Sequence, residues 1–119
     1  FRGAGKGVET LELITRASRF KSWFHEDFGR FGDDVEQLPF DQYLMRALIA
    51  PRVVLSTDAR GDTWANPRGV EAAWLGAQPV FDLLGVPENN RIHFREGGHD
   101  QLPPDFSHLL DVADTYFHN

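Results

Sequence analysis

The 119-residue sequence has no cysteine, which excludes disulfide bonds, thiolate metal sites and a cysteine nucleophile. It also lacks an excess of basic residues, because 12 Lys and Arg stand against 18 Asp and Glu, giving a formal net charge of −6. Without a basic stripe to release counterions from phosphates, we expect no nucleic-acid partner. Long apolar runs are missing as well. The most apolar stretch, residues 43–55, is broken by Arg46, Pro51 and Arg52, so we expect no membrane span.

Strand and helix patterns alternate in the second half of the sequence. Residues 52–56 form an apolar, β-branched run typical of a buried parallel strand, and residues 91–95 predict a second strand. Apolar residues at helical spacing predict a helix over 70–84 between them, and Pro103 and Pro104 suit the first turn of a final helix. This order predicts an α/β fold, with a right-handed βαβ unit and one more helix. Two strands leave an uncovered apolar edge, so the sheet is incomplete. Either a segment predicted here as helix forms another strand, or a partner or a missing part of the chain supplies it.

The first half of the sequence predicts mainly helix. Apolar residues recur at helical spacing after Glu9, at Leu13, Ala17, Phe20 and Phe24. Residues 41–49 predict a second, shorter helix. In the helix of the second half, Pro79 should kink or interrupt the helical path, and Gly85 should end it.

Polar loops follow both predicted strands, and adjacent parallel strands end at the same edge of a sheet. The first loop, residues 57–67, carries Asp58 and Asp62, and the second delivers His99 after two glycines. A carboxylate bonded to one ring nitrogen of a histidine fixes its tautomer and leaves the other nitrogen as a general base. We therefore expect Asp62 to reach His99, with Asp58 as the competing acid. The alternatives are a surface histidine in a turn and aspartates that cap a turn or the next helix.

The nucleophile that would complete a triad is not recognisable. None of the serines sits in a Gly-x-Ser-x-Gly-type elbow; they are Ser18, Ser22, Ser56 and Ser107. An acid followed by a late histidine is the order of α/β-hydrolases, whose nucleophile precedes both. A metal site made of His93, His99 and an aspartate is disfavoured, because His93 alternates with its apolar neighbours and should point to the opposite face. We expect no metal and no cofactor.

Several stretches resemble the glucuronoyl esterases. Residues 62–69, which read Asp-Thr-Trp-Ala-Asn-Pro-Arg-Gly, resemble that family's Asp-x-Trp-Ala-Asp-Pro-x-Gly loop. Residues 47–52, Ala-Leu-Ile-Ala-Pro-Arg, resemble the Leu-Ile-Ala-Pro-Arg run before its late strand, and residues 95–99, Arg-Glu-Gly-Gly-His, resemble its Arg-x-Gly-x-His motif. The Trp-Phe pair at 23–24 and the Leu-Pro-Phe-Asp-Gln run at 38–42 also have counterparts, in the same order.

The resemblance implies a function and a set of site residues. The family is a metal-independent α/β-hydrolase group that cleaves esters between glucuronic acid on xylan and lignin alcohols. His99 would be the catalytic histidine, and Asp62 stands at the position of the acid that some members use, whereas others use a glutamate on an earlier strand. Trp64 resembles the tryptophan that packs on the glucuronate, and Glu9 would match a glutamate that contacts a sugar hydroxyl. Asn66 replaces the second aspartate of the family's loop.

The resemblance also implies how much of the enzyme is present. Residues 1–119 would be the C-terminal segment of one α/β-hydrolase domain whose preceding part, absent here, holds the serine. The whole protein would be a serine-type carboxylic ester hydrolase resembling 4-O-methyl-glucuronoyl methylesterase, acting on a glucuronate ester or glucuronoxylan and secreted or periplasmic. The segment alone should be inactive.

Two other interpretations remain open. One is a non-catalytic α/β module that serves sugar binding or subunit contact. The other is a different α/β-hydrolase, such as an acetyl esterase or a peptidase, which would share His99 and an acid but would not need Trp64.

Overall fold

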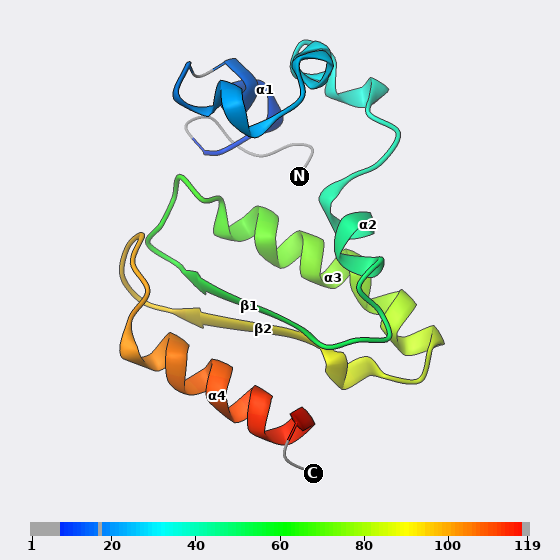
Figure 1. Ribbon diagram of the computed structural model, residues 1–119, viewed down its shortest axis with the longest axis vertical. Coiled ribbons are helices and arrows are strands. Elements are labelled where there is room, and N and C mark those ends of the chain that lie inside the picture. Colours follow the sequence, from blue (N-terminus) through cyan, green and yellow to red (C-terminus); the bar gives the residue numbers. More distant parts are fainter. Residues whose placement is uncertain (1–7, 17, 118–119) are drawn as a thin grey trace.

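Two parallel strands form the centre of the molecule, with a long helix on either side of them (Figure 1). The computed structural model describes residues 8–16 and 18–117. The first half of the chain contains α1 (Leu11–Arg16), the 3₁₀ helices η1 (Ser18–Trp23), η2 (Glu26–Gly32) and η3 (Val35–Gln37), and α2 (Gln42–Ala47). The second half contains β1 (Val54–Ala59), α3 (Pro67–Leu83), the 3₁₀ helix η4 (Pro87–Asn89), β2 (Asn90–Arg95) and α4 (Pro103–Phe117). Within the described ranges, no helix is long and apolar enough to cross a membrane.

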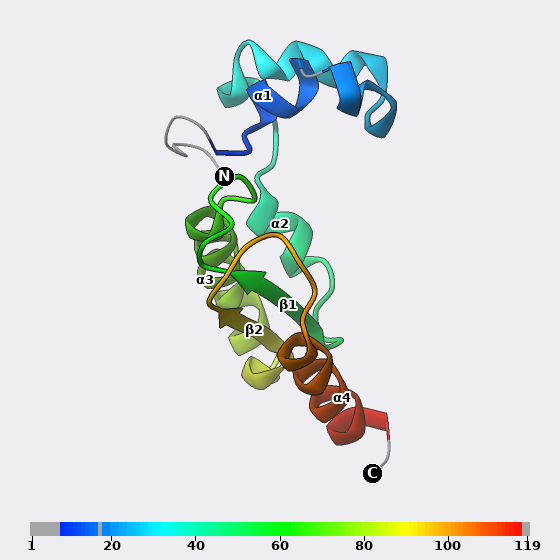
Figure 2. The same cartoon turned by 90° about the vertical axis from the view of Figure 1, so that its left-hand side faces the viewer.

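The strands pair in parallel, as the βαβ order predicts. Their register runs from Val54 opposite Asn90 to Ala59 opposite Arg95. Turned by 90°, the molecule shows α3 and α4 on opposite sides of the strands, with the helical segments before α2 gathered at one end (Figure 2). The predicted range 52–56 is wrong at both ends of β1, because the chain still turns at the start of that range and pairing continues further. As a consequence, Asp58 lies within a strand and not in a loop.

The two faces of β2 contact different helices. Asn90 faces α3, where it accepts the indole N–H of Trp74 on its backbone oxygen (2.9 Å) and donates its side-chain amide to the Trp74 carbonyl (3.0 Å). The opposite face contacts α4 through polar and aromatic side chains, which we call the β2–α4 seam. Its three pairs are Arg91 with Tyr116, His93 with His108, and Arg95 with Asp105.

α4 starts at Pro103, as the two prolines predict, but its apolar stripe does not face the sheet. The stripe's large side chains are exposed; they are Phe106, Leu109, Leu110 and Phe117. The face that packs on the strands contains the buried residues Asp105 and Val112 and the ring of His108. The described part of the chain therefore leaves the more apolar side of this helix uncovered.

α3 is positioned by its first residues and continues through a proline. Asn66 caps the helix from a left-handed conformation (φ 59°), and its side chain accepts the N–H of Gly69 at 3.1 Å. The sequence predicts that Pro79 kinks or interrupts the helix; the interruption is wrong, since α3 runs on to Leu83. A proline leaves the carbonyl four residues earlier without its helical partner. Here that carbonyl belongs to Leu75, which is exposed like Pro79, so water can satisfy it.

Arg46, which breaks the most apolar stretch of the sequence, is buried between α2 and the strands. Its guanidinium donates at 2.6 Å to Asn90 Oδ1, Ser56 Oγ and the Arg91 carbonyl. Burial lowers the pKa of Arg46 from its ordinary value, an effect that the negative charge of Asp58 partly offsets. These bonds fix α2 against both strands.

The segment before α2 is not the continuous helix that the sequence predicts. α1 ends at Arg16, and the chain continues in 3₁₀ turns, where the ring of Phe20 contacts that of Trp23 at a tilt and Phe24 stacks on Phe28. Ala17 of the predicted stripe lies outside the described residues. Serine and aromatic residues are weaker helix formers than alanine or leucine, and here the aromatic rings pack on one another instead.

Candidate active site

Asp62 and His99 form a direct hydrogen bond at the carboxyl end of the two strands. Nδ1 of His99 lies 2.6 Å from Oδ2 of Asp62. The Asp62 side chain is only 12% exposed, and its other oxygen accepts the backbone N–H of Ala65 at 3.3 Å. An ionised carboxylate only accepts hydrogen bonds, so in the neutral imidazole this contact favours the tautomer with the proton on Nδ1 and the lone pair on Nε2. The His99 ring is 85% exposed, which leaves Nε2 accessible.

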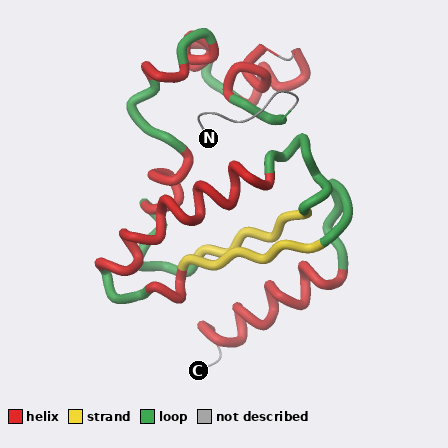
Figure 3. The backbone as a smooth tube through the Cα atoms, turned by 180° about the vertical axis from the view of Figure 1, so that it is seen from behind, coloured by secondary structure: helices red, strands yellow, loops and turns green. Residues whose placement is uncertain are grey.

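The loops that carry these residues touch through two glycines. Figure 3 shows the two loops leaving the strands at the same end of the sheet. There the backbone of Gly61 approaches Gly97 so closely that a Cβ on Gly61 would lie 2.4 Å from the Gly97 carbonyl oxygen. Gly97 has φ +105°, a conformation that L side chains rarely adopt. The close approach brings Asp62, the next residue in its loop, within reach of His99.

The carboxylate of Asp62 raises the pKa of His99 above its ordinary value. The hydrogen bond from Asp62 is the largest cause, and the negative charge of Asp62 follows. Asp100 and Glu9 add smaller effects in the same direction, while partial desolvation opposes them. The arrangement thus stabilises the imidazolium that forms when His99 accepts a proton.

Asp58, the competing acid, occupies a different environment. It lies in β1 opposite Phe94, partly buried, and the hydrogen bond of His99 goes to Asp62 instead. Desolvation raises the pKa of Asp58, although the nearby charge of Arg46 acts against this shift. The structure thus brings Asp62, and not Asp58, to the histidine.

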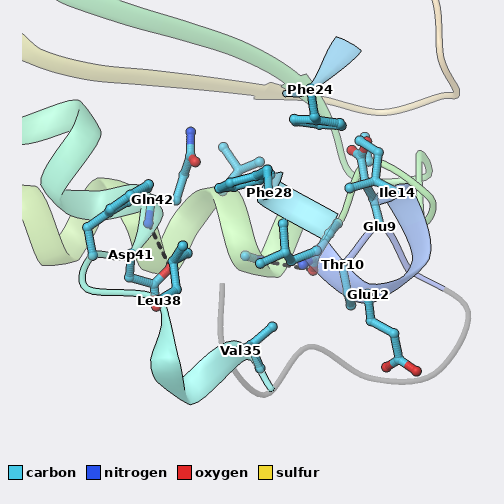
Figure 4. A pocket seen from close by; sticks show the side chains of 16 residues that line it. Glu9, Thr10, Glu12, Ile14, Phe24, Phe28, Val35, Leu38, Asp41 and Gln42 are labelled. Atoms are coloured by element: carbon cyan, nitrogen blue, oxygen red, sulfur yellow. Dashed lines mark hydrogen bonds between the residues drawn. The ribbon is translucent and has the colours of Figure 1, made fainter. Parts of the chain in front are cut away.

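The structure joins Glu9 and Trp64 through their backbones. The N–H of Glu9 donates to the Trp64 carbonyl at 2.6 Å, so the segment before α1 is attached to the loop that holds Asp62. Glu9 also lines a cavity of about 580 Å³ between the N-terminal helical segments and the start of α3 (Figure 4). The cavity wall includes the aromatic rings of Phe24 and Phe28, but neither Asp62 nor His99.

The remaining candidate residues are engaged in structural contacts. Ser56 accepts a hydrogen bond from Arg46, and the His93 ring stacks on His108 of α4 with centroids 4.2 Å apart. His93 thus points away from the face of Ile92 and Phe94, as the alternation predicts. Among residues 8–16 and 18–117, no three His, Asp or Glu side chains are placed to hold a metal ion.

Comparison with known protein families identifies one that this chain matches. A family model described as "Glucuronyl esterase, fungi" matches residues 2–85, well over half of the sequence. The chain belongs to the glucuronoyl esterase family. The matched range includes Glu9, Asp62 and Trp64 and ends before β2.

Curated relatives of this family come from bacteria and fungi. The carbohydrate esterase MZ0003, from an unknown prokaryotic organism, is 36% identical over 123 residues, which cover 91% of this chain and 28% of the relative. A 4-O-methyl-glucuronoyl methylesterase of Schizophyllum commune is 32% identical over 95 residues, covering 80% of this chain and 23% of the relative. The chain therefore spans less than a third of the length of these relatives.

Solved glucuronoyl esterase structures share the fold. A promiscuous CE15 esterase from a marine bacterial metagenome superimposes with a TM-score of 0.82 at 32% identity, covering 92% of this chain and 31% of that one. A glucuronoyl esterase from Solibacter usitatus superimposes with a TM-score of 0.77 at 27% identity, covering 88% and 31%. This chain therefore corresponds in fold to about a third of each of these solved esterases.

Sequence reasoning missed the residues that hold the histidine loop from behind. Arg95 is the first residue of the motif at residues 95–99, and Asp105 lies in the first turn of the helix that begins at Pro103. Their buried contact spans the loop, and no periodicity or short motif links two such positions. The sequence offered one signal: an arginine at the end of a strand, shortly before two glycines, together with an aspartate in the first turn of the next helix.

Proposed function

We propose that the whole protein containing this chain is a serine-type carboxylic ester hydrolase that acts on esters of glucuronic acid, with His99 as the general base and Asp62 as the acid that orients it. The 2.6 Å contact between Nδ1 of His99 and Oδ2 of Asp62, with the ring otherwise open to solvent, carries the proposal. Family membership supplies the substrate class, because several relatives are named 4-O-methyl-glucuronoyl methylesterases.

The proposed chemistry is acyl transfer through a covalent intermediate. Nε2 of His99 takes the hydroxyl proton of a serine in the preceding part of the domain while the serine oxygen attacks the ester carbonyl carbon. The imidazolium, stabilised by the Asp62 carboxylate, then gives its proton to the departing alcohol oxygen. A water molecule, deprotonated by the same nitrogen, then attacks the acyl carbon, and the imidazolium of His99 gives that proton to the serine oxygen as the acyl–serine bond breaks.

Trp64 and Glu9 are proposed to seat the sugar. Trp64 follows Asp62 by two residues in the same loop, and we propose that its ring packs on the sugar, as aromatic residues commonly do at sugar sites. The backbone of Glu9 is hydrogen-bonded to that of Trp64, and the Glu9 carboxylate offers an acceptor for a sugar hydroxyl. An acetyl esterase or a peptidase would not need either side chain.

The rest of the domain is proposed to supply the nucleophile and to complete the sheet. The chain covers about 28% of one relative and 31% of the solved neighbours, which leaves room for the remaining strands. The exposed apolar stripe of α4 is the kind of surface that such chain would cover. Because the proposed substrate belongs to plant cell walls, we place the whole protein outside the cytoplasm, secreted or periplasmic.

The test is hydrolysis of a benzyl ester of glucuronic acid by the full-length protein. We expect the wild type to be active and His99→Ala to lose at least about 10³-fold in kcat, since the proposed general base is removed. His25→Ala is the matched control, because His25 is another exposed histidine and lies at the N-terminus of the 3₁₀ helix η2. Wild-type turnover by His99→Ala would assign this chain to a non-catalytic module.

The isolated segment offers a second test of the same proposal. Without the nucleophilic serine and the oxyanion donors proposed to lie in the preceding part, purified residues 1–119 should give no saturable hydrolysis. Turnover by the segment that disappears with His99→Ala would contradict the absence of the nucleophile.

A further inference from the structure

Arg95 binds the first half of the loop that carries His99 and forms an ion pair with α4. Its Nε donates to Asp105 Oδ2 at 2.6 Å, its Nη1 to the Glu96 carbonyl at 3.0 Å and its Nη2 to the Gly98 carbonyl at 3.2 Å. The Arg95 side chain is 9% exposed and that of Asp105 is 1% exposed. A buried guanidinium thus binds the backbone on the N-terminal side of His99.

Asp105 extends the grip to the far end of the loop. The same Oδ2 that accepts from Arg95 also accepts the backbone N–H of Leu102 at 2.8 Å. The Leu102 N–H and the Arg95 guanidinium both lower the pKa of Asp105, which keeps the carboxylate ionised. The segment from Glu96 to Leu102 is therefore closed at both ends by one ion pair.

His99 has few other means of keeping its position. Its ring is largely exposed, and the two residues before it are glycines, which have the largest conformational entropy to lose. Beyond the Asp62 contact, the loop has one local backbone bond, from Asp100 N to the Gly98 carbonyl, and a long contact of 3.4 Å from Gln101 to Thr57.

We infer that Arg95, locked by Asp105, is the positioning residue that holds Nδ1 of His99 on Asp62. The inference rests on the proposed function and deepens it. An arginine is required because its planar guanidinium presents donors in several fixed directions, and the three acceptors here lie in different directions. A lysine keeps the charge but offers a single ammonium that cannot hold all three acceptors in the same geometry.

The experiment compares two arginines of β2 in the full-length esterase. Arg95→Lys is the test variant, and Arg91→Lys is its control. Arg91 lies on the same face of the same strand and also meets α4, but its guanidinium contacts Tyr116 and the Glu88 carbonyl, away from the histidine loop. A merely structural role of buried arginines would give both variants the same behaviour.

We expect Arg95→Lys to lower kcat about 10- to 100-fold with KM within about twofold, since a small displacement of a catalytic group has effects of this size. The acid limb of the pH profile of kcat/KM should also move to lower pH, because a loosened Asp62 contact no longer raises the pKa of His99. Asp100 and Glu9, the other charged groups that face His99, are untouched by this change. Arg91→Lys should retain both kcat and the position of the limb.

A second variant removes the grip without leaving a buried charge unpaired. Arg95→Met combined with Asp105→Leu replaces the ion pair by apolar side chains, an exchange that buried pairs often tolerate. This double variant should fold and show the same loss of kcat and the same shift of the limb. Wild-type kcat and an unmoved limb in either Arg95 variant would overturn the inference.

A readout without substrate separates this inference from the proposed function. The pKa of His99, followed by NMR titration of its ring protons and assigned with His99→Ala, should fall in Arg95→Lys and not in Arg91→Lys. If the wild-type protein hydrolyses no glucuronate ester, the proposed function fails while this titration still decides the role of Arg95. An unchanged pKa in Arg95→Lys rejects the positioning role whatever the activity.

Discussion

Gly61 and Gly97 meet backbone to backbone, and this contact sets the distance between the two loops that carry Asp62 and His99. A Cβ on Gly61 would lie 2.4 Å from the Gly97 carbonyl oxygen and 3.2 Å from its carbonyl carbon. The obstacle is backbone and not a flexible side chain, so a neighbouring rotamer cannot relieve it. The geometry of the acid–histidine pair therefore depends on the absence of a side chain at residue 61.

Gly61→Ala should separate the loops and weaken the site. We expect a loss of about 1–3 kcal/mol in the free energy of unfolding, typical of overpacking, and a fall in kcat of about 10-fold or more. Urea denaturation and ester hydrolysis by the full-length protein measure the two effects. Gly29→Ala is the matched control, because a Cβ there meets no atom within 4 Å. An Asp62–His99 pair insensitive to loop spacing would leave kcat of Gly61→Ala at the wild-type level.

The pH dependence of activity should report the Asp62 contact. In the proposed mechanism His99 can accept a proton only when it is neutral, so we expect kcat/KM to rise as the pH increases through the pKa of His99, which Asp62 holds above its ordinary value. Asp62→Asn should move this acid limb to lower pH and reduce kcat by about 10²- to 10⁴-fold, because the tautomer and the imidazolium lose their partner.

The control for that experiment is the same change at the neighbouring carboxylate. Asp58→Asn should leave the acid limb in place, since the hydrogen bond of His99 goes to Asp62. Near-normal kcat in Asp62→Asn would instead assign the working acid to a glutamate in the remainder of the domain.

Trp64 should affect binding of the sugar more than the chemical step. Trp64→Ala should raise KM about 3- to 10-fold for a glucuronate ester, the effect of losing one ring contact, and change kcat less. Trp74→Phe provides the contrast, because the Trp74 indole donates to the Asn90 carbonyl inside the fold. That variant should lose about 1 kcal/mol of stability and keep its KM. Equal KM values for Trp64→Ala and the wild type would argue for an esterase of another substrate class.

Asn66 should tolerate aspartate but not alanine. Its left-handed backbone and its bond to the Gly69 N–H suit Asn and Asp, and a carboxylate is favourable at a helix N-terminus. We expect Asn66→Ala to cost about 1–2 kcal/mol of stability and Asn66→Asp to be within about 0.5 kcal/mol of the wild type. Thermal unfolding of the full-length protein distinguishes them, and equal melting temperatures for all three would remove the capping argument.

The topology of the second half could be predicted from the sequence because the signals for its strands and helices are local. The β-branched run, the helical spacing after Asn66 and the two prolines before α4 each depend on neighbouring residues, and together they predict parallel strands whose loops meet. The prediction that Asp62 reaches His99 follows from that topology alone. The extension of β1 to Ala59 was missed because Thr57 and Asp58 are polar residues that pair with β2 within the sheet.

The features that sequence reasoning missed depend on contacts between distant residues. Arg46 resembles an interruption of an apolar run, yet its acceptors lie on β1 and β2. The helical stripe after Glu9 predicts one helix, but the aromatic rings at its end pack among themselves. The two prolines before α4 predict where the helix begins but not which of its sides meets the strands, because local signals do not identify the partner of an apolar face.

The β2–α4 seam has a consequence for the evolution of the histidine loop. A helix that packs through apolar side chains alone can shift slightly along a strand. Here three specific side-chain pairs, at successive positions along β2, are formed together in only one alignment of α4. An inserted or deleted residue between Arg95 and Pro103 could not be absorbed by sliding the helix, and the change would fall entirely on the backbone around His99. We therefore expect this loop to keep its length across homologues even where its residues vary.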